Sequence, residues 1–308
     1  MDTNKSLIEK VHFQINGNEL FSFHVKRDDL IDPIISGNKW RKLEYHVLEA
    51  QHRQKSGILT FGGAFSNHLI ATAKACQIAG LQSIGFVRGS ELSPESNETL
   101  RACSDFGMEL IFVSRDEYRL KDEPFYRNEL ALKFPTFYVV PEGGKGYQGI
   151  IGCQKILKET ANNYDNVYLA AGTGTTATGV VLSANPNTQI HVVSALKGEF
   201  MSKNVQNFLY KSLFDEELVE DYLSRMIFID DKRFGGFGKV NDVLINFINE
   251  VYRTTRLKLD PIYTGKAFYQ LIEDYKSGIV KSSDKILFIH TGGLQGANSW
   301  KDKLDYFK

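Results

Sequence analysis

The stretch Val167-Tyr168-Leu169-Ala170-Ala171-Gly172-Thr173-Gly174-Thr175-Thr176-Ala177-Thr178-Gly179 joins a short apolar run to a turn rich in glycine and threonine. We expect a buried strand over 167–170, because parallel strands covered on both faces are apolar throughout. The glycines let the backbone close on a ligand, the threonines add hydroxyl donors, and the next helix points its N-terminus at negative charge. The stretch therefore predicts an α/β fold with a phosphate-binding loop at a strand end.

The residues around this loop narrow the kind of phosphate that it could bind. A P-loop needs Gly-Lys followed by Ser or Thr, and the loop contains no lysine. The span 172–177 matches the loose dinucleotide pattern GxGxxA, which also needs an acidic residue about 20 positions further on. Residues 193–197 read Val-Ser-Ala-Leu-Lys and offer none. A terminal phosphate monoester is the better ligand for the loop, which consists of Gly172, Thr173, Gly174, Thr175 and Thr176.

Short apolar runs alternate with helical patterns along the rest of the chain. The expected strands are 57–61, 83–87, 109–113, 137–140, 190–194, 226–229 and 286–289, and the expected helices include 66–79, 93–106, 117–132 and 147–160. Strands separated by helices of about ten residues or more predict parallel sheets with right-handed crossovers. The order of elements predicts two three-layer α/β domains, with a small domain over 51–145 inserted into a large one made of 1–50 and 146–308.

Length, charge and composition exclude several classes of protein. A chain of 308 residues is longer than a domain with a single hydrophobic core usually is. A hydrophobic content of 42% is typical of a folded globular chain. The 37 basic and 37 acidic residues cancel, so no net charge favours nucleic acid or an anionic membrane as a partner. The segment 166–196 is nearly uncharged, but Gly, Thr, Asn and Pro186 interrupt it, so we expect no membrane helix there.

The N-terminus and the cysteines predict the compartment. Residues 1–10 carry charges of both signs and no apolar run, so we expect no secretory signal. The cysteines, Cys76, Cys103 and Cys153, are odd in number and form no CxxC pair. This pattern predicts a reduced cytoplasmic protein without a metal site, in which each cysteine is a small core residue rather than a nucleophile.

A second motif is Ser36-Gly37-Asn38-Lys39-Trp40-Arg41-Lys42-Leu43-Glu44. Asn38 suits a helix N-cap, and Leu43, Val47 and Leu48 give the following helix an apolar stripe. Lys39 would then lie in the first helical turn, where the helix dipole disfavours a positive charge. A neutral amine, or one consumed in a Schiff base with a carbonyl cofactor, fits this position, and a solvated lysine is the simple alternative.

Three other loops carry residues suited to binding. In Gly62-Gly63-Ala64-Phe65-Ser66-Asn67-His68, the capping residues and free backbone N–H groups could hold a substrate carboxylate, or could serve only as a helix cap. The loop Asp260-Pro261-Ile262-Tyr263-Thr264-Gly265-Lys266 offers a tyrosine ring and a neutral hydroxyl, and His290-Thr291-Gly292-Gly293 follows the expected strand 286–289. Each of these loops by itself could be ordinary.

Together these motifs resemble the pyridoxal 5'-phosphate (PLP)-dependent family that contains 1-aminocyclopropane-1-carboxylate deaminase and D-cysteine desulfhydrase. The fold of that family resembles the tryptophan synthase β subunit, which is PLP fold type II. The resemblance runs in order from about residue 25 to residue 293. It is carried by GNKWRKLE (37–44), GGAFSNH (62–68), PEGG (141–144), GTGTT (172–176), DPIYTGKAF (260–268) and HTGG (290–293), which are jointly specific.

The resemblance implies PLP as the cofactor and a small amino acid as the substrate. Lys39 would form the Schiff base with PLP, Gly172–Thr176 would hold its phosphate, and Asn67 would bond its ring hydroxyl. Tyr263 would lie against the ring and Thr264 would face the pyridine nitrogen. Ser66, Asn67 and His68 would border the substrate carboxylate. The base that removes the α-proton would be Lys39, Tyr263 or Ser66.

Two positions separate the two activities of this family. Its deaminases typically have Glu where this chain has Thr264, and Gln where it has His68. A glutamate keeps the pyridine nitrogen protonated, which strengthens the electron sink and helps to open a cyclopropane. A neutral threonine gives a weaker sink, which suffices when thiolate leaves from the β-carbon. The resemblance therefore favours D-cysteine desulfhydrase, with pyruvate, ammonia and hydrogen sulfide as products, over 1-aminocyclopropane-1-carboxylate deaminase.

One departure from the family pattern keeps other classes open. Phe237 lies where relatives usually carry a tyrosine near the substrate, so the chain could have another substrate or be a PLP-binding protein without catalysis. A nucleotide-dependent oxidoreductase is a third class, which the missing acidic residue after 190–194 disfavours. We expect a cytoplasmic homodimer that binds neither nucleic acid nor membrane.

Overall fold

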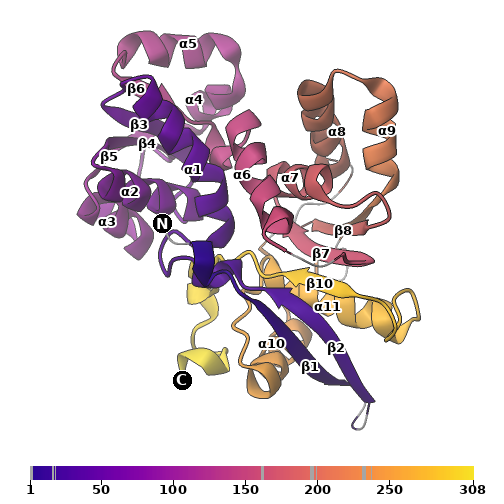
Figure 1. Ribbon diagram of the computed structural model, residues 1–308. Coiled ribbons are helices and arrows are strands. Elements are labelled where there is room, and N and C mark those ends of the chain that lie inside the picture. The colour runs from indigo at the N-terminus through magenta and orange to yellow at the C-terminus, as the bar shows by residue number, and fades with distance from the viewer. Residues whose placement is uncertain are drawn as a thin grey trace. The chain divides into compact units, whose positions relative to one another are not determined.

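The structure is a computed structural model that describes residues 3–15, 17, 19–160, 163–194, 198, 200–230, 234–236 and 238–308. The chain forms two compact units (Figure 1). The larger unit comprises Met1–Ile31, Ser36–Asn38 and Cys153–Lys308, and the smaller unit comprises Asp32–Ile35 and Lys39–Gly152. The boundaries expected from the sequence placed 39–50 in the large domain, whereas these residues cluster with the smaller unit.

A mixed sheet of six strands forms the centre of the larger unit. Its order is β1-β2-β10-β7-β8-β9, with bounds Ile8–Ile15, Glu19–Lys26, Ile286–Ile289, Asn166–Ala171, Gln189–Ser194 and Met226–Asp230. β2, β10, β7, β8 and β9 run parallel, and β1 is antiparallel to β2. The expected α/β class with parallel sheets is confirmed. The hairpin β1–β2 is an addition, because its strands alternate buried and exposed residues and contain no apolar run.

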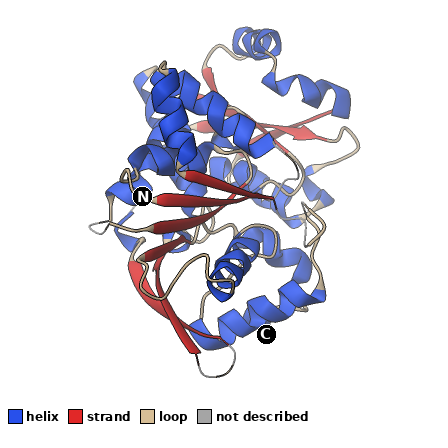
Figure 2. Cartoon of the chain, turned by 90° about the vertical axis from the view of Figure 1, so that its right-hand side faces the viewer, coloured by secondary structure: helices blue, strands red, loops and turns tan. Residues whose placement is uncertain are grey.

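Helices cover both faces of this sheet (Figure 2), and alternate residues of β7 contribute to the two cores that result. Tyr168 and Ala170 face the core formed with α10 (Asp242–Thr255) and α11 (Thr264–Lys276). Val167, Leu169 and Ala171 face the opposite core. The helices of that second core are α6 (Tyr147–Lys158), α7 (Thr175–Ser183), α8 (Phe200–Leu213) and α9 (Glu216–Ser224). The larger unit is therefore a three-layer sandwich.

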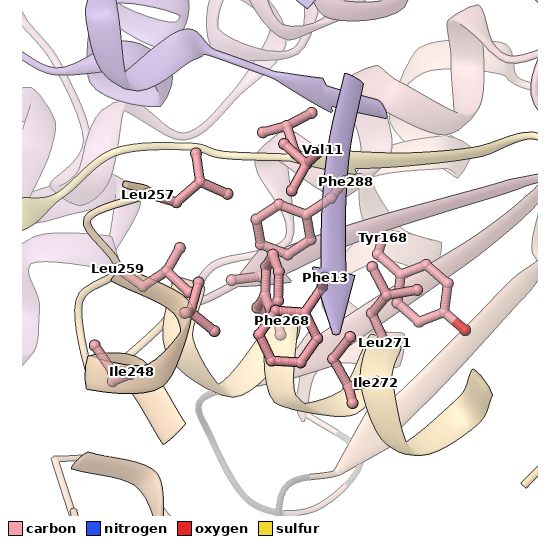
Figure 3. Packing of buried hydrophobic residues seen from close by; sticks show 14 of the residues in the cluster. Val11, Phe13, Tyr168, Ile248, Leu257, Leu259, Phe268, Leu271, Ile272 and Phe288 are labelled. Carbon is pink, nitrogen blue, oxygen red and sulfur yellow. The ribbon is translucent and has the colours of Figure 1, made fainter. Parts of the chain in front are cut away.

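Edge-to-face aromatic packing fills the core beneath the β1–β2 hairpin (Figure 3). The ring of Phe268, on α11, lies 5.9 Å from the Phe13 ring on β1 and 5.2 Å from the Phe288 ring on β10. Such T-shaped pairs add about 0.5–1.5 kcal/mol each beyond the area that they bury. This packing fixes α11, and with it the residues at its N-terminus, against the sheet.

The smaller unit is a parallel sheet in the order β5-β4-β3-β6, with bounds Met108–Val113, Gln82–Arg88, Gly57–Gly62 and Phe137–Val139. One face packs against α1 (Gly37–His52), α2 (Asn67–Ala79) and α3 (Glu98–Asp105). The other face packs against α4 (Arg115–Arg119) and α5 (Pro124–Lys133). Pro124 explains why the single helix expected over 117–132 is two helices, since proline starts a helix but does not continue one.

Short 3-10 turns complete the two units, at Thr3–Lys5, Asp28–Leu30, Pro94–Ser96, Leu120–Asp122, Glu142–Gly144, Leu294–Trp300 and Asp305–Phe307. Among the residues that the structure describes, no helix has the length and apolar character needed to cross a bilayer. Cys76, Cys103 and Cys153 are free thiols buried in the cores, as the sequence predicts for small core residues.

Candidate functional site

The start of α1 is anchored to the loop that follows β10. Ser36 adopts a positive φ of 64°, and its Oγ accepts a hydrogen bond of 2.8 Å from the backbone N–H of Gly293. The backbone N–H of Asn38 donates to the carbonyl of Thr291 over 3.1 Å. The second motif and the HTGG motif therefore meet within the larger unit. Asn38 is the second residue of α1 rather than its cap, and Lys39 lies in the first turn as expected.

Two glycines permit this close contact. A Cβ on Gly37 would lie 2.3 Å from the carbonyl oxygen of Asp28, and a Cβ on Gly292 would lie 1.8 Å from Ser36 Oγ. Both distances are far below van der Waals contact, so a side chain at Gly37 would displace the backbone of Asp28 and one at Gly292 would displace the side chain of Ser36. These close contacts explain why both motifs have glycine at these positions. They also hold the start of α1 against the loop that follows β10.

Within the smaller unit, two buried histidines lie near Lys39 and Lys42. Burial lowers the pKa of His68 well below its usual 6.5, and the positive charges of Lys39 and Lys42 lower it further. Burial also lowers the pKa of His46 to about 4. Both imidazoles are therefore neutral at pH 7, and the cluster avoids the repulsion that an imidazolium would add beside the lysines.

The hydrogen bonds of His68 fix its tautomer. The Thr60 hydroxyl donates to the carbonyl of Val140 over 2.8 Å, so it can only accept at its 2.8 Å contact with His68 Nε2. Nε2 therefore carries the hydrogen and Nδ1 has a lone pair. Nδ1 is buried and has no hydrogen-bond partner among the residues that the structure describes. An acceptor of this kind favours an ammonium or hydroxyl as its neighbour rather than the carboxylate that the resemblance placed beside His68.

Ser66 caps α2, as its residue type predicts. Its Oγ accepts hydrogen bonds from the backbone N–H groups of His68 and Leu69, both over 3.3 Å. These bonds use the lone pairs of the hydroxyl and leave its hydrogen to be donated. The geometry favours Ser66 as a donor to an anion and disfavours it as a base. Asn67, the first residue of α2, is partly buried beside it.

The glycine-threonine loop has the geometry of an anion site. Gly174 has a φ of 87° and is the N-cap of α7, but it offers no side chain to cap the first backbone N–H groups. The first turn of α7 contains no acidic residue, and Thr175 and Thr176 are buried there. Thr173 Oγ1 lies 3.3 Å from Thr175 Oγ1, so these two hydroxyls are neighbours. Uncapped N–H groups beside hydroxyl donors fit a phosphate.

Tyr263 lies against this loop within the larger unit. A Cβ on Gly172 would lie 3.3 Å from Cε1 and 3.5 Å from the hydroxyl oxygen of Tyr263. The missing side chain of Gly172 therefore makes room for the tyrosine ring. The residues at 172–176 and Tyr263, distant in sequence, form one group because β7 and α11 pack against each other.

Asp260 is a member of this group that the sequence reasoning did not assign. Its Oδ1 accepts from the N–H groups of Ile262 and Tyr263 over 2.9 and 2.7 Å. Its Oδ2 accepts from the N–H of Thr264 over 2.9 Å and from the Thr264 hydroxyl over 2.6 Å. Asp260 and Thr264 are fully buried. The signal in the sequence was an aspartate before a turn with threonine four positions later, a pattern typical of local side-chain capping.

The expected site residues thus form two groups, one in each unit. The smaller unit holds Lys39, Ser66, Asn67 and His68, and the larger unit holds the loop Gly172–Thr176 with Tyr263 and Thr264. Phe237, the expected substrate contact, lies outside the described residues. The buried Lys266 donates from Nζ to the carbonyl of Gly236, the residue before Phe237 in the sequence, over 3.0 Å.

Comparisons with known proteins show what the whole chain is similar to. A family model described as "Pyridoxal-phosphate dependent enzyme" matches residues 11–292. A Pyrococcus horikoshii protein with the provisional name 1-aminocyclopropane-1-carboxylate deaminase is 32% identical, over 91% of this chain and 87% of the relative. A mitochondrial protein of Arabidopsis thaliana, named as bifunctional D-cysteine desulfhydrase/1-aminocyclopropane-1-carboxylate deaminase, is 31% identical over 94% of this chain and 75% of the relative. A solved structure of a protein described as the ACC deaminase homologue has 30% identity and a TM-score of 0.77, covering 94% of this chain and 89% of the other.

Proposed function

Because the chain belongs to the pyridoxal-phosphate dependent enzyme family, we propose that it is a PLP-dependent lyase acting on D-cysteine. The reaction takes D-cysteine and water to pyruvate, ammonia and hydrogen sulfide. The runner-up is the deamination of 1-aminocyclopropane-1-carboxylate, which with water gives 2-oxobutanoate and ammonia. The names of the relatives support both substrates, so the choice between them rests on the residues of this chain.

The described residues fit the cofactor. When bound, PLP supplies an electron sink for the negative charge that develops at the substrate α-carbon. Lys39 would bind it covalently through Nζ, and the uncapped N-terminus of α7 with the Thr175 and Thr176 hydroxyls would hold its phosphate. Asn67 would bond the ring hydroxyl, and Tyr263 would lie against the ring.

The contact between Thr264 and Asp260 supports the choice of D-cysteine. Thr264 would face the pyridine nitrogen with a lone pair, because its hydrogen is directed to Asp260. A neutral hydroxyl holds a pyridinium proton less firmly than a carboxylate in direct contact would, so the sink is weaker than with glutamate. A substrate that carries its own good leaving group, such as a thiolate, needs less help from the sink than a strained ring carbon does.

The other residues would orient the substrate and move its protons. Ser66 would donate its hydroxyl hydrogen to the substrate carboxylate, since its lone pairs already accept two backbone N–H groups. His68 Nδ1 would accept from a hydrogen-bond donor of the substrate. The amine of Lys39 is the best candidate for the α-proton base, and the Tyr263 hydroxyl is the alternative. Phe237 would border the substrate.

Two measurements test the proposal in order. The purified protein should show the visible absorption of bound PLP at about 410–420 nm, which a nicotinamide-dependent enzyme lacks. D-Cysteine, L-cysteine, D-serine and 1-aminocyclopropane-1-carboxylate should then be assayed side by side. Absorption without turnover of any of the four would favour a PLP-binding protein that is not catalytic. Sedimentation of the same preparation tests the expected homodimer.

A further inference from the structure

A cavity of about 430 Å³ in the smaller unit combines a high density of basic groups with a buried tyrosine. It is lined by Arg88, Arg115, Tyr118, Arg119, Lys121 and Glu142. Four of the six lining side chains are cationic and one is a carboxylate. None of them belongs to the group of Lys39, Ser66, Asn67 and His68. Glu142 belongs to the PEGG motif, to which the proposed reaction gives no role.

The topology places this cavity where α/β sheets bind ligands. Arg88 is the last residue of β4, Arg115 follows the end of β5, and Glu142 follows the end of β6. The strand order β5-β4-β3-β6 reverses between β3 and β6, because the chain runs from β3 through β4 to β5 and then returns to the far side of β3. Ligands of such sheets bind outside the carboxyl ends of the strands near that reversal.

Two lining residues of the cavity, Tyr118 and Glu142, are hydrogen-bonded to each other. Tyr118 is only 5% exposed, and its hydroxyl donates to Glu142 Oε1 over 2.6 Å. Glu142 Oε2 lies 3.4 Å from Lys121 Nζ, which also lies 5.1 Å from the centre of the Tyr118 ring. Lys121 Nζ also lies 3.2 Å from Asp122 Oδ2, and Asp122 pairs in turn with Lys145 over 2.6 Å. The two lysines and the two carboxylates of this network largely cancel, so the three arginines determine what the cavity attracts.

Among the described residues, the three arginines of the cavity have at most weak partners. Arg88 has no carboxylate partner in the part of the chain that the structure describes, and its guanidinium carbon lies 5.8 Å from the centre of the Tyr118 ring. Arg115 pairs with Glu91 over 2.6 Å and Arg119 with Asp116 over 2.8 Å, but both pairs are largely exposed to solvent. Exposed pairs contribute little to stability, so a doubly charged ligand can replace those carboxylates.

We propose that this cavity is a binding site for a phosphate dianion, either free inorganic phosphate or the phosphate group of a small metabolite. Guanidinium groups pair with phosphate in bidentate geometry, which makes arginine the residue suited to this ligand. Arg88 Nη2 lies 3.7 Å from the Cβ position of Gly63, so an anion held by Arg88 lies beside the loop that leads to Ser66. The site would thus be next to the residues that we assign to the substrate.

The test is a calorimetric titration. The PLP-loaded protein, in a buffer that contains no phosphate, is titrated with inorganic phosphate, and the heat of binding is measured. Loading with PLP fills the loop 172–176, so that added phosphate reports on another site. We expect saturable binding that Arg88→Gln and Arg115→Gln each weaken about tenfold or more. Glu142→Gln should tighten binding, because it removes the one carboxylate of the lining. Arg101→Gln, on the exposed surface of α3, is the matched control and should bind as the wild type does.

A second titration with glycerol 3-phosphate identifies the source of the phosphate. Tighter binding of the monoester than of inorganic phosphate assigns the site to a phosphorylated metabolite, and the reverse order assigns it to free phosphate. The proposal is overturned if phosphate gives no saturable binding, or if Arg88→Gln and Arg115→Gln bind as the wild type does. Equal weakening by Arg101→Gln would also overturn it, because only the general charge of the surface would then be at work.

Discussion

The hydroxyl of Thr264 donates its hydrogen to Asp260 Oδ2 over 2.6 Å and accepts the backbone N–H of Asp260 over 2.9 Å. With its hydrogen committed, this hydroxyl can offer only a lone pair to any further group. The two carboxylate oxygens of Asp260 accept four hydrogen bonds in all, from Ile262 N, Tyr263 N, Thr264 N and Thr264 Oγ1.

Asp260→Asn should therefore destabilise the protein strongly. The amide NH₂ would replace an oxygen that now accepts two donors, and would leave buried N–H groups unsatisfied. We expect a loss of about 2–3 kcal/mol in the free energy of unfolding, measured by urea denaturation. Thr264→Ser keeps the hydroxyl and is the matched control, with a loss below about 1 kcal/mol. A change of less than about 0.5 kcal/mol for Asp260→Asn would show that the carboxylate has no structural role.

Lys39→Ala should abolish the covalent attachment of PLP. Lys39 is the lysine in the first turn of α1, at the position that Gly37 and Gly292 fix. Borohydride reduction of the wild type, followed by peptide mapping, should place the pyridoxyl label on Lys39. Lys39→Arg keeps the positive charge but cannot be labelled, so it separates attachment from charge. A label on Lys42 or on another lysine would refute the assignment.

Single Thr→Val changes at Thr175 and Thr176 should weaken PLP binding. Both hydroxyls are buried in the first turn of α7, where no acidic residue competes with a phosphate. A hydrogen bond to a charged group contributes about 1.5–3 kcal/mol, so each change should raise the Kd for PLP about tenfold or more. Thr178→Val is a control in the same helix, because that hydroxyl donates to the carbonyl of Gly174 over 3.0 Å. If both test variants bind PLP normally, the phosphate lies elsewhere.

D-Cysteine should turn over with a kcat/KM at least about a hundredfold above that for 1-aminocyclopropane-1-carboxylate, a difference of about 2.7 kcal/mol in transition-state stabilisation. The reason is that Thr264 is neutral and favours a substrate with its own leaving group. Thr264→Glu should narrow the ratio, as measured by the formation of pyruvate and 2-oxobutanoate. Faster ring opening than elimination by the wild type would reverse our choice of substrate.

The free energy of unfolding should fall as the pH drops from about 6.5 to about 4, in part because of His46. Burial lowers the pKa of His46 in the folded protein to about 4, whereas an unfolded histidine titrates near 6.5. The unfolded state therefore binds this proton first, and the stabilisation that is complete above pH 6.5 is lost as the pH falls toward 4. The effect is on the order of 3 kcal/mol.

His46→Gln isolates this contribution from those of His68 and His191, whose pKa values burial also lowers. We expect the difference in unfolding free energy between wild type and variant to shrink toward acid pH. A difference that stays constant between pH 7 and pH 4.5 would contradict the assignment. His52→Gln, near the C-terminal end of the same helix and exposed, is the control.

The sequence predicts much of the fold because a buried parallel strand appears in it as a short, largely apolar run. Residues 57–61 are apolar except for Thr60, residues 167–170 carry no charge, and both segments are buried strands. The hairpin β1–β2 gives no such signal, because half of its residues face away from the core. A helix rarely continues through a proline, so Pro124 begins a second helix in a region where the composition predicts a single one.

The candidate site is predictable only where a residue acts locally. Ser66 as a cap follows from its type and position, and the structure agrees. The open Nδ1 of His68 depends on Thr60 and Val140, which no local pattern links to it. The cavity lined by Arg88 and Arg115 cannot be predicted from a local pattern either, because the two residues come together only through the pairing of β4 with β5.

The pairing of β2 with β10 has a consequence for how the chain is made on the ribosome. β2 ends at Lys26, whereas its partner strand β10 begins at Ile286, 260 residues later in the chain. Until β10 has been synthesised, the edge of β2 that it covers has open backbone N–H and C=O groups that can pair with another nascent chain. The smaller unit, whose strands all lie within 57–139, has no such delay. Fragments that stop before residue 286 should therefore aggregate through β2, and chaperones that cover N-terminal strands should matter more for this protein than for one whose central strands are neighbours in sequence.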